Sequence, residues 1–220
     1  MIMLFSTYGL ALLAGLGVTL QMCGIAWVVG LVVGSALGYA SLRCPKSVGV
    51  IVRTAACVIT AVPFLVLLFW LHYPAQAAFG VVVPPIVTAS VALALFNTIT
   101  TADLVIRGFG DFPADLLDAA TYTGLPAGVT YRRIVLPVLV RRLFPALLIN
   151  QVVLLHMSLL ASFISVDELL RVIQRINSRE YQPTVLYGVL AALFGGITLS
   201  ATYLAGVAKR KFMLELSEGA

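Results

Sequence analysis

Apolar residues run along this chain in tracts much longer than an amphipathic helix or an alternating strand produces. Apolar tracts beyond about 18 residues predict membrane-spanning helices. The tract between residues 54 and 102 is long enough to cross twice, and the sequences HYPAQ and VVPP near its middle supply prolines and polar groups for a turn. The pattern therefore predicts five spans, near residues 14–39, 51–71, 86–106, 138–160 and 184–207.

Composition supports this interpretation. Hydrophobic residues make up 61% of the 220 positions and charged residues only 10%, which a water-soluble core of this size could not hide. We therefore expect an all-α, polytopic membrane protein with about five transmembrane helices. Residues 1–220 are expected to form a single transmembrane domain.

The basic residues predict the orientation of the chain in the membrane. Eleven of the fourteen Lys and Arg residues follow the first span, follow the third span or lie in the C-terminal tail. Because cytoplasmic loops retain positive charge, the N-terminus is expected outside and the C-terminus inside. The same bias explains the net charge of +5, so a nucleic-acid partner is not expected. No Lys or Arg precedes Arg43, so the first span is expected to remain uncleaved.

One cytoplasmic segment, DAATYTGLPAGVTYRRIVLP at residues 118–137, is unusually polar and rich in turn residues. Pro113 suits the first turn of a helix, and Gly124 suits a left-handed helix end. Pro126 can open a second short helix, and Pro137 is expected to break it before the fourth span begins. The pattern predicts a helical hairpin on the cytoplasmic side.

This segment resembles the EAA loop of bacterial ABC-importer permeases, which forms the coupling helix that docks onto the ATP-binding subunit. Aspartate replaces the family's usual glutamate at position 118, which keeps the charge but shortens its reach. The resemblance implies that the loop 108–137 couples this chain to a separate ATPase. The matching residues are Asp118, Ala119, Ala120, Gly124, Ile134, Leu136 and Pro137.

The resemblance extends along most of the chain and is greatest to the polar amino-acid uptake branch (His, Glu, Gln, Arg and opines). LLAGLGVTLQ at 12–21 resembles the branch's opening, and IRGFGDFPADLLDAA at 106–120 resembles the approach to the coupling loop. LLASFISVDELLRVIQRINSREYQP at 159–183 resembles the external segment after the fourth span. The methionine-importer branch is a weaker match, mainly through AVPFLVLLFW at 61–70.

The resemblance implies a permease subunit that moves an amino acid or similar small polar solute into the cytoplasm by alternating access. Its implied partners are an ATP-binding cassette subunit, a second permease that is identical or paralogous, an extracytoplasmic substrate-binding protein and the lipid bilayer. The implied location is the bacterial inner membrane, with multiple passes. ATP and Mg would be bound by the partner ATPase, and no cofactor is expected in this chain, which lacks a GxxxxGK[ST] phosphate loop.

Solute contacts are expected at His156, Met157 and Ser158 in the fourth span, facing Pro63 and Leu67 in the second. Members of the branch usually have a lysine, then an acidic or amide residue, then a hydroxyl residue at the first three positions. Their usual RGTPLLVQ in the second span is TAVPFLVL here. A site without these charges holds a zwitterion poorly, so either the solute is less polar or a paralogous partner binds it. His156 could instead bond a neighbouring helix.

Other features indicate packing rather than chemistry. Gly30, Gly34 and Gly38 form a flat helical face, for which packing within the chain is favoured over packing against a second permease. The charged segment 167–180 predicts either a solvated outer helix or a docking surface for the substrate-binding protein.

No catalytic or metal-ligand constellation emerges. His72 and His156 lie on different spans without supporting carboxylates, and the three cysteines lack CxxC spacing. The chain is therefore not expected to be an enzyme. An ion channel or a proton-coupled carrier is an alternative, although it would usually need ionisable residues within the spans, and a membrane scaffold is a third.

Overall fold

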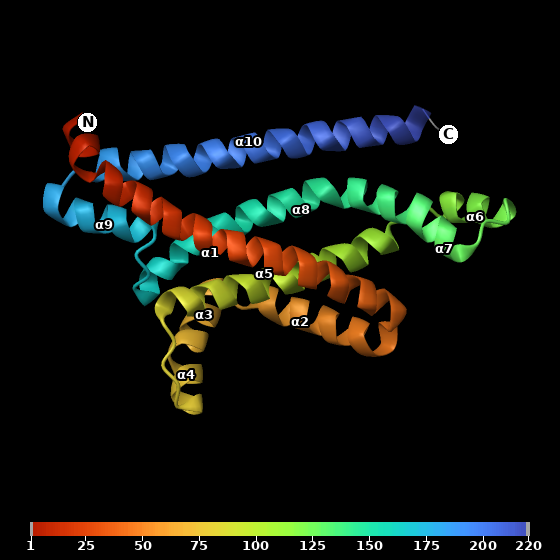
Figure 1. The fold of residues 1–220 in the computed structure, drawn as a ribbon, viewed down its shortest axis with the longest axis horizontal. Helices are drawn as coiled ribbons and strands as arrows, with labels where there is room; N and C mark the ends of the chain where they lie inside the picture. Colours follow the sequence, from red (N-terminus) through yellow and green to blue (C-terminus); the bar gives the residue numbers. More distant parts are fainter. Residues whose placement is uncertain (1, 219–220) are drawn as a thin grey trace.

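The computed structural model of the chain is a bundle of long helices that run along one common direction (Figure 1). It describes the backbone of residues 2–218; the side chains of residues 2–6, 114, 119 and 212–218 lie outside the described part. The four long helices are α1 (Ile2–Arg43), α5 (Pro85–Gly110), α8 (Leu136–Ser158) and α10 (Pro183–Glu218). Among the described residues, four helical stretches, 7–43, 85–110, 127–164 and 183–211, are long and apolar enough to cross a membrane.

The second predicted span is not one helix. After a short π-helical turn, η1 (Pro45–Gly49), the chain forms α2 (Val50–Ala61), α3 (Phe64–His72) and α4 (Pro74–Phe79). The segment from α3 to α4 turns by 99° from the segment that ends with α2. Val62 and Pro63 cause the break, because both are extended and proline cannot donate the helical hydrogen bond.

The span predicted near 51–71 is therefore not one straight helix, although its two bent segments together are long and apolar enough to count as a fifth span. Of the two sequences expected to form the turn, HYPAQ lies mostly within α4, whereas VVPP lies mostly in the non-helical residues 80–84, which begin at Gly80 with a φ of +63°.

The centre of the bundle is the close contact between α1 and α5. A Cβ atom at Gly30 would lie 2.2 Å from Nδ2 of Asn97, and one at Gly34 would lie 2.6 Å from the carbonyl oxygen of Thr98. At Gly38 the nearest atom would be Cβ of Val105, 2.7 Å away. The glycine face thus packs within the chain, which confirms that expectation.

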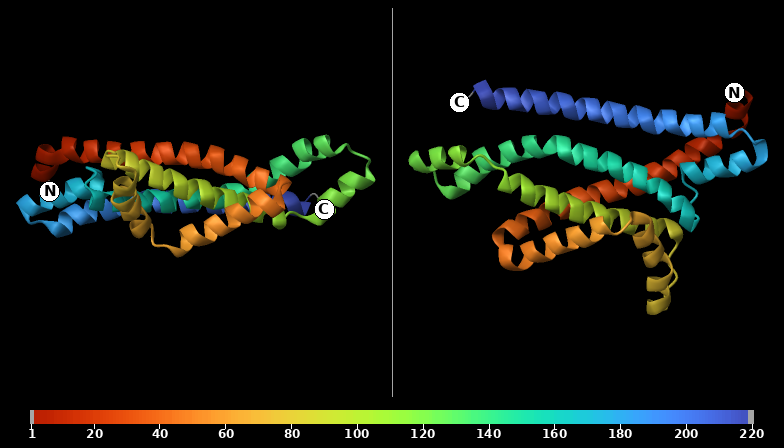
Figure 2. Two further views of the ribbon diagram at one scale, coloured as in Figure 1. Left: turned by 90° about the horizontal axis from the view of Figure 1, so that it is seen from below. Right: turned by 180° about the vertical axis from the view of Figure 1, so that it is seen from behind.

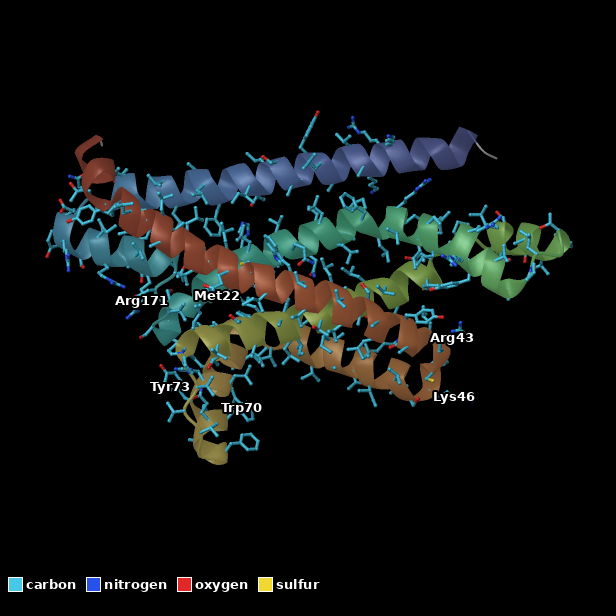
Figure 3. The ribbon with its side chains drawn as sticks, viewed as in Figure 1. Met22, Arg43, Lys46, Trp70, Tyr73 and Arg171 are labelled. Atoms are coloured by element: carbon cyan, nitrogen blue, oxygen red, sulfur yellow. The ribbon has the colours of Figure 1, made fainter. Side chains whose placement is uncertain are left out.

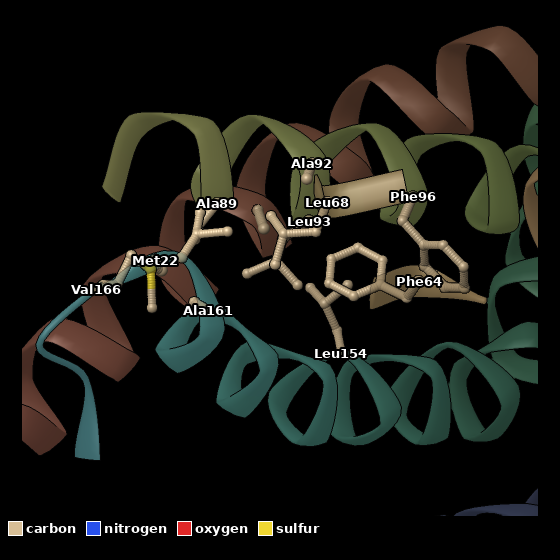
Figure 4. Packing of buried hydrophobic residues seen from close by; sticks show 12 residues of the cluster. Met22, Phe64, Leu68, Ala89, Ala92, Leu93, Phe96, Leu154, Ala161 and Val166 are labelled. Atoms are coloured by element: carbon tan, nitrogen blue, oxygen red, sulfur yellow. The ribbon is translucent and has the colours of Figure 1, made fainter. Parts of the chain in front are cut away.

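A buried apolar cluster fills the space beside this contact (Figure 4). Phe64 of α3 meets Phe96 of α5 edge to face, with ring centroids 5.7 Å apart. Leu154 of α8 and Ala161 of the 3-10 helix η3 (Leu159–Ile164) complete it from the other side. A second cluster joins α1, α8 and α10 to α9 (Leu169–Glu180), so α9 is fixed to the bundle by its apolar face.

The two ends of the bundle differ. At one end α6 (Ala114–Tyr122) and α7 (Ala127–Thr130) form a hairpin that extends beyond the neighbouring helices, and the π-helical turn η2 (Tyr131–Val135) connects α7 to α8. At the other end lie the N-terminus and α9, while α10 runs along one side (Figure 2).

Candidate functional site

The hairpin has the geometry that its sequence predicts. After α6, Gly124 takes a φ of +68°, the N–H of Gly124 donates to the carbonyl of Thr121 at 3.0 Å, and the N–H of Leu125 donates to the carbonyl of Ala120 at 3.2 Å. These two bonds form a Schellman motif, which closes the helix with a left-handed residue. Pro126 is extended and opens α7. The structural prediction for Gly124 is therefore confirmed.

The hairpin has an exposed surface. Asp118 is exposed, and it makes no hydrogen bond or ion pair with any described residue. Leu117, Tyr122 and Leu125 are exposed to 40%, 91% and 41%. Ala120 is buried, and the side chain of Ala119 lies outside the described residues. A carboxylate among exposed apolar side chains at the tip of a bundle can dock onto another protein.

The second half of the predicted coupling sequence belongs to a continuous helix. Ile134 is half-buried, Leu136 is 41% exposed and Pro137 is half-buried. The expected break at Pro137 does not occur, and the helix runs on from residue 127 to residue 164. The π-helical turn over Tyr131–Val135 explains this. In a regular α-helix the ring of Pro137 would clash with the carbonyl four residues before it, and the wider turn of a π-helix leaves room for the ring.

An aromatic cluster that the sequence analysis missed joins the base of the hairpin to the bundle. The ring of Tyr131 stacks on Phe109 of α5, with centroids 6.2 Å apart, and contacts Tyr39 of α1, with centroids 5.6 Å apart. Arg43 donates to the hydroxyl of Tyr39 at 2.7 Å. Arg142 also donates to the carbonyl of Asp111 at 2.8 Å, just before α6. A movement of the hairpin would therefore be transmitted to α1, α5 and α8.

The five residues expected to contact solute do not come together in one pocket. Leu67 and Met157 pack against the same apolar cluster, beside Phe64 and Leu154. Pro63 is exposed and begins α3. The region between the second and fourth predicted spans is thus filled by apolar side chains.

The two polar members of that set have partners within the chain. Ser158 is fully buried and donates to the carbonyl of Leu155 on its own helix at 2.7 Å. His156 points toward α10, where its Nε2 lies 2.9 Å from Oγ1 of Thr198 and its ring contacts Phe194. The side chain of His156 therefore bonds a neighbouring helix and does not face α3.

A buried polar network at the centre of the bundle was missed. Asn97 of α5 is fully buried, and its Nδ2 donates to the carbonyl of Ala26 and to Oε1 of Gln151, both at 2.9 Å. Its Oδ1 accepts from Nδ2 of Asn150 at 2.8 Å and, at 3.3 Å, from Thr101 and Gln151. Neutral amides inside a membrane span can join helices by such bonds. The scattered Asn and Gln residues gave no pattern by which the sequence could have revealed them.

At the opposite end from the hairpin, α9 is a capped helix with a buried carboxyl group. Glu168 is fully buried, and its carboxylate accepts from the N–H groups of Leu170 and Arg171, both at 2.9 Å. Burial raises the pKa of Glu168 to about 7, against the lowering effect of these two hydrogen bonds.

The outer face of α9 is charged. Arg171, labelled in Figure 3, donates to the carbonyl of Ser162 at 3.0 Å, and Arg175 pairs with Asp167. Both alternatives for segment 167–180, a solvated helix or a docking surface, require such an exposed charged face.

These features define a class: a helical membrane protein with an exposed hairpin at one end, whose base packs against the bundle. Residues 29–210 match the family described as binding-protein-dependent transport system inner membrane component. The chain belongs to this family.

Curated relatives are consistent with the match. The chain is 26% identical over 207 residues to the nopaline transport system permease protein NocM of Agrobacterium fabrum, covering 90% of this chain and 86% of that protein. It is 25% identical over 196 residues to the histidine/lysine/arginine/ornithine transport system permease protein HisQ of Salmonella typhimurium, covering 83% and 86%. These relatives are permease subunits, so the chain is a transporter component and not an enzyme.

Two solved structures share the fold. A chain from an amino acid ABC transporter crystallised with histidines superimposes with a TM-score of 0.84 at 23% identity, covering 94% of this chain and 96% of that one. A chain from the inward-facing MetNI methionine ABC transporter superimposes with a TM-score of 0.71 at 19% identity, covering 92% and 98%.

Proposed function

We propose that this chain is the permease of an ATP-driven importer for an amino acid or an amino-acid-derived polar solute such as an opine. The hairpin carries the proposal, because an exposed carboxylate beside apolar side chains, on a rigid base, is suited to receiving motion from an ATPase. The relatives named for nopaline and for basic amino acids favour the solute class. The methionine importer shares the fold at lower similarity, and no feature of the site favours it.

The proposed assembly has four kinds of component. An ATP-binding subunit, which binds ATP and Mg, docks at Asp118 and Ala119 on α6 and at the turn formed by Gly124; the expected contact at Ala120 is not retained, because its side chain is buried and its carbonyl accepts from Leu125 within the turn. A second permease completes the path, and a substrate-binding protein delivers solute at the end that carries α9. In this arrangement the chain lies in the bacterial inner membrane with the N-terminus outside and the C-terminus inside. Cysteines at Ser178 and Ser47, two exposed serines toward opposite ends of the bundle, test the orientation. In intact cells that express the chain without its three native cysteines, a membrane-impermeant thiol reagent should label the cysteine that replaces Ser178 but not the one that replaces Ser47.

The turn at Gly124 provides the sharpest test of coupling. A Cβ at Gly124 or at Gly128 would meet no atom within 4 Å, but only Gly124 has a positive φ. Gly124→Val therefore adds backbone strain of about 1–2 kcal/mol to the motif, whereas Gly128→Val adds the same side chain without this strain. We expect Gly124→Val to insert normally but to lose transport and co-purifying ATPase. Normal transport and ATPase recovery in Gly124→Val would refute the coupling role.

For the solute, we propose that this subunit shapes the path while a paralogous permease makes the polar contacts. The apolar packing of Leu67 and Met157, together with the His156–Thr198 bond, supports this division of roles. His156→Ala and Ser158→Ala should then leave solute affinity and selectivity unchanged when assembly is intact. A changed selectivity in either variant would instead assign solute contact to this subunit at these residues.

A further inference from the structure

The segment from Phe64 to Val83, which we name the arm, leaves the bundle sideways. It comprises α3, α4 and the turn that follows them, and it is bent by 99° from the direction of α2 (Figures 1 and 2). Phe64 lies inside the bundle against Phe96, whereas His72 and Gln76 contact Thr88, close to where α5 begins at Pro85. The outer part of the arm, α4 and the turn that follows it, therefore lies near the level of the span ends opposite the hairpin, and the arm runs across the span direction.

The outer surface of the arm is apolar and aromatic. Val66, Trp70 and Tyr73 are 53%, 60% and 56% exposed, and Phe79 and Val82 are 81% and 97% exposed. Figure 3 shows Trp70 and Tyr73 on this part of the chain. No charged residue occurs between Arg53 and Asp103. A surface of this composition in water would carry the full cost of exposing apolar area, about 25 cal/mol per Å².

The side chains of His72 and Gln76 in the arm bond to each other and to Thr88 of α5. Gln76 accepts from the N–H of Val83 at 2.8 Å and donates to the hydroxyl of Thr88 at 3.0 Å. His72 lies 3.1 Å from the same amide nitrogen of Gln76 and 3.3 Å from Thr88. These contacts hold the returning chain against α4 and leave no side-chain amide available for another subunit.

The backbone after α4 sets the depth at which the arm can lie. Residues 80–84 are not helical, and Gly80, Val81 and Val82 are exposed. The N–H groups of Gly80, Val81 and Val83 bond within the chain, but the N–H of Val82 and the carbonyls of residues 80–82 bond to no described residue. Such unpaired, exposed groups are not tolerated in the hydrocarbon region, where they would find no partner. The side chains favour lipid and the turn requires water or headgroups, and the lipid–water interface provides both.

We propose that the outer part of the arm, α4 and the turn that follows it, lies in the lipid–water interface at the end of the bundle opposite the hairpin, with lipid as its partner. Trp and Tyr side chains favour this region of a bilayer. The arm also presents large apolar side chains at Trp70, Phe79 and Val82, which lipid accommodates. α4 would then hold the chain at the membrane surface where it returns to α5.

Spin labelling tests this placement on the full chain, reconstituted into liposomes with its ATPase. A nitroxide is attached at Phe79→Cys in a protein lacking the three native cysteines. Its collisions with oxygen, which concentrates in lipid, and with a nickel chelate, which stays in water, are then measured. Controls are Val28→Cys, which is 65% exposed within α1, and Ser178→Cys, which is exposed on α9.

We expect the Phe79 label to lose most of the nickel collisions seen at Ser178 while retaining oxygen collisions, with values between those of the two controls. Nickel collisions equal to those at Ser178 would place the arm in water and overturn the proposal. Low collision rates with both reagents would also overturn it, because they would show the arm covered by protein, such as a second permease. Val82→Cys repeats the measurement without removing the Phe79 ring.

Discussion

Helices α5 and α10 are both apolar spans, yet one is the centre of the molecule and the other its periphery. In the most apolar stretch of each, 56% of the α5 residues are buried but only 11% of the α10 residues. The difference comes from the residues through which each helix contacts its neighbours. Glycines of α1 admit α5 to close contact, and Asn97 bonds to both α1 and α8. Between α8 and α10, the side-chain hydrogen bond that we identify joins His156 and Thr198.

The comparison shows that apolarity puts a helix in the membrane but does not decide its neighbours. Lipid tails are as apolar as leucine, so helix association depends on close packing and hydrogen bonds.

The largest expected effect comes from adding a methyl group at the glycine contact between α1 and α5. Gly34→Ala places a methyl group 2.6 Å from the backbone carbonyl of Thr98, which cannot move aside as a side chain can. We expect a loss of about 1–3 kcal/mol in stability, measured by thermal unfolding in detergent. Gly196→Ala on α10 is the matched control, since its Cβ would meet nothing within 4 Å, and it should be neutral or stabilising. Equal losses at both positions would remove the distinction between the two helices.

A smaller effect is expected from removing the central amide. Asn97→Leu leaves Thr101, Asn150 and Gln151 without an acceptor that they use, and should cost about 2 kcal/mol. Thr198→Val, which breaks the bond to His156 at the periphery, should cost about 0.6 kcal/mol. Denaturant unfolding of the two variants in one detergent compares them. A loss at Thr198 as large as that at Asn97 would contradict the peripheral role of α10.

A pH-dependent effect is expected at α9, on which the outer end of α10 rests. The pKa of Glu168 is raised from about 4.5 to about 7, so the folded state binds its proton more tightly than the unfolded state does. Stability from this group is therefore fully present below about pH 4.5 and is lost as pH rises through 7. Relative to Glu168→Gln, which has no such titration, the wild-type Tm should rise when the pH falls from 8 to 5.5. A difference that stays constant across this range would exclude the titration.

The sequence by itself determined the features that depend on local conformation or on transfer into lipid. Four spans follow from apolar length, because each must cross about the same thickness of hydrocarbon. The hairpin follows from Gly124 and Pro126, since their allowed backbone angles alone favour a helix end and a new start.

The tertiary structure alone decided which side chains meet. Asn97, Asn150 and Gln151 lie on two helices distant in sequence, and nothing local indicates that they share one network. His156 could have faced α3 or α10, and only the packing of α8 turns it to Thr198. The helix break at Val62 and Pro63 was also not predictable from the hydrophobic pattern, because a proline between apolar residues can either kink a span or break it. Contacts between distant segments depend on helix rotation and crossing, which residue types along one helix do not specify.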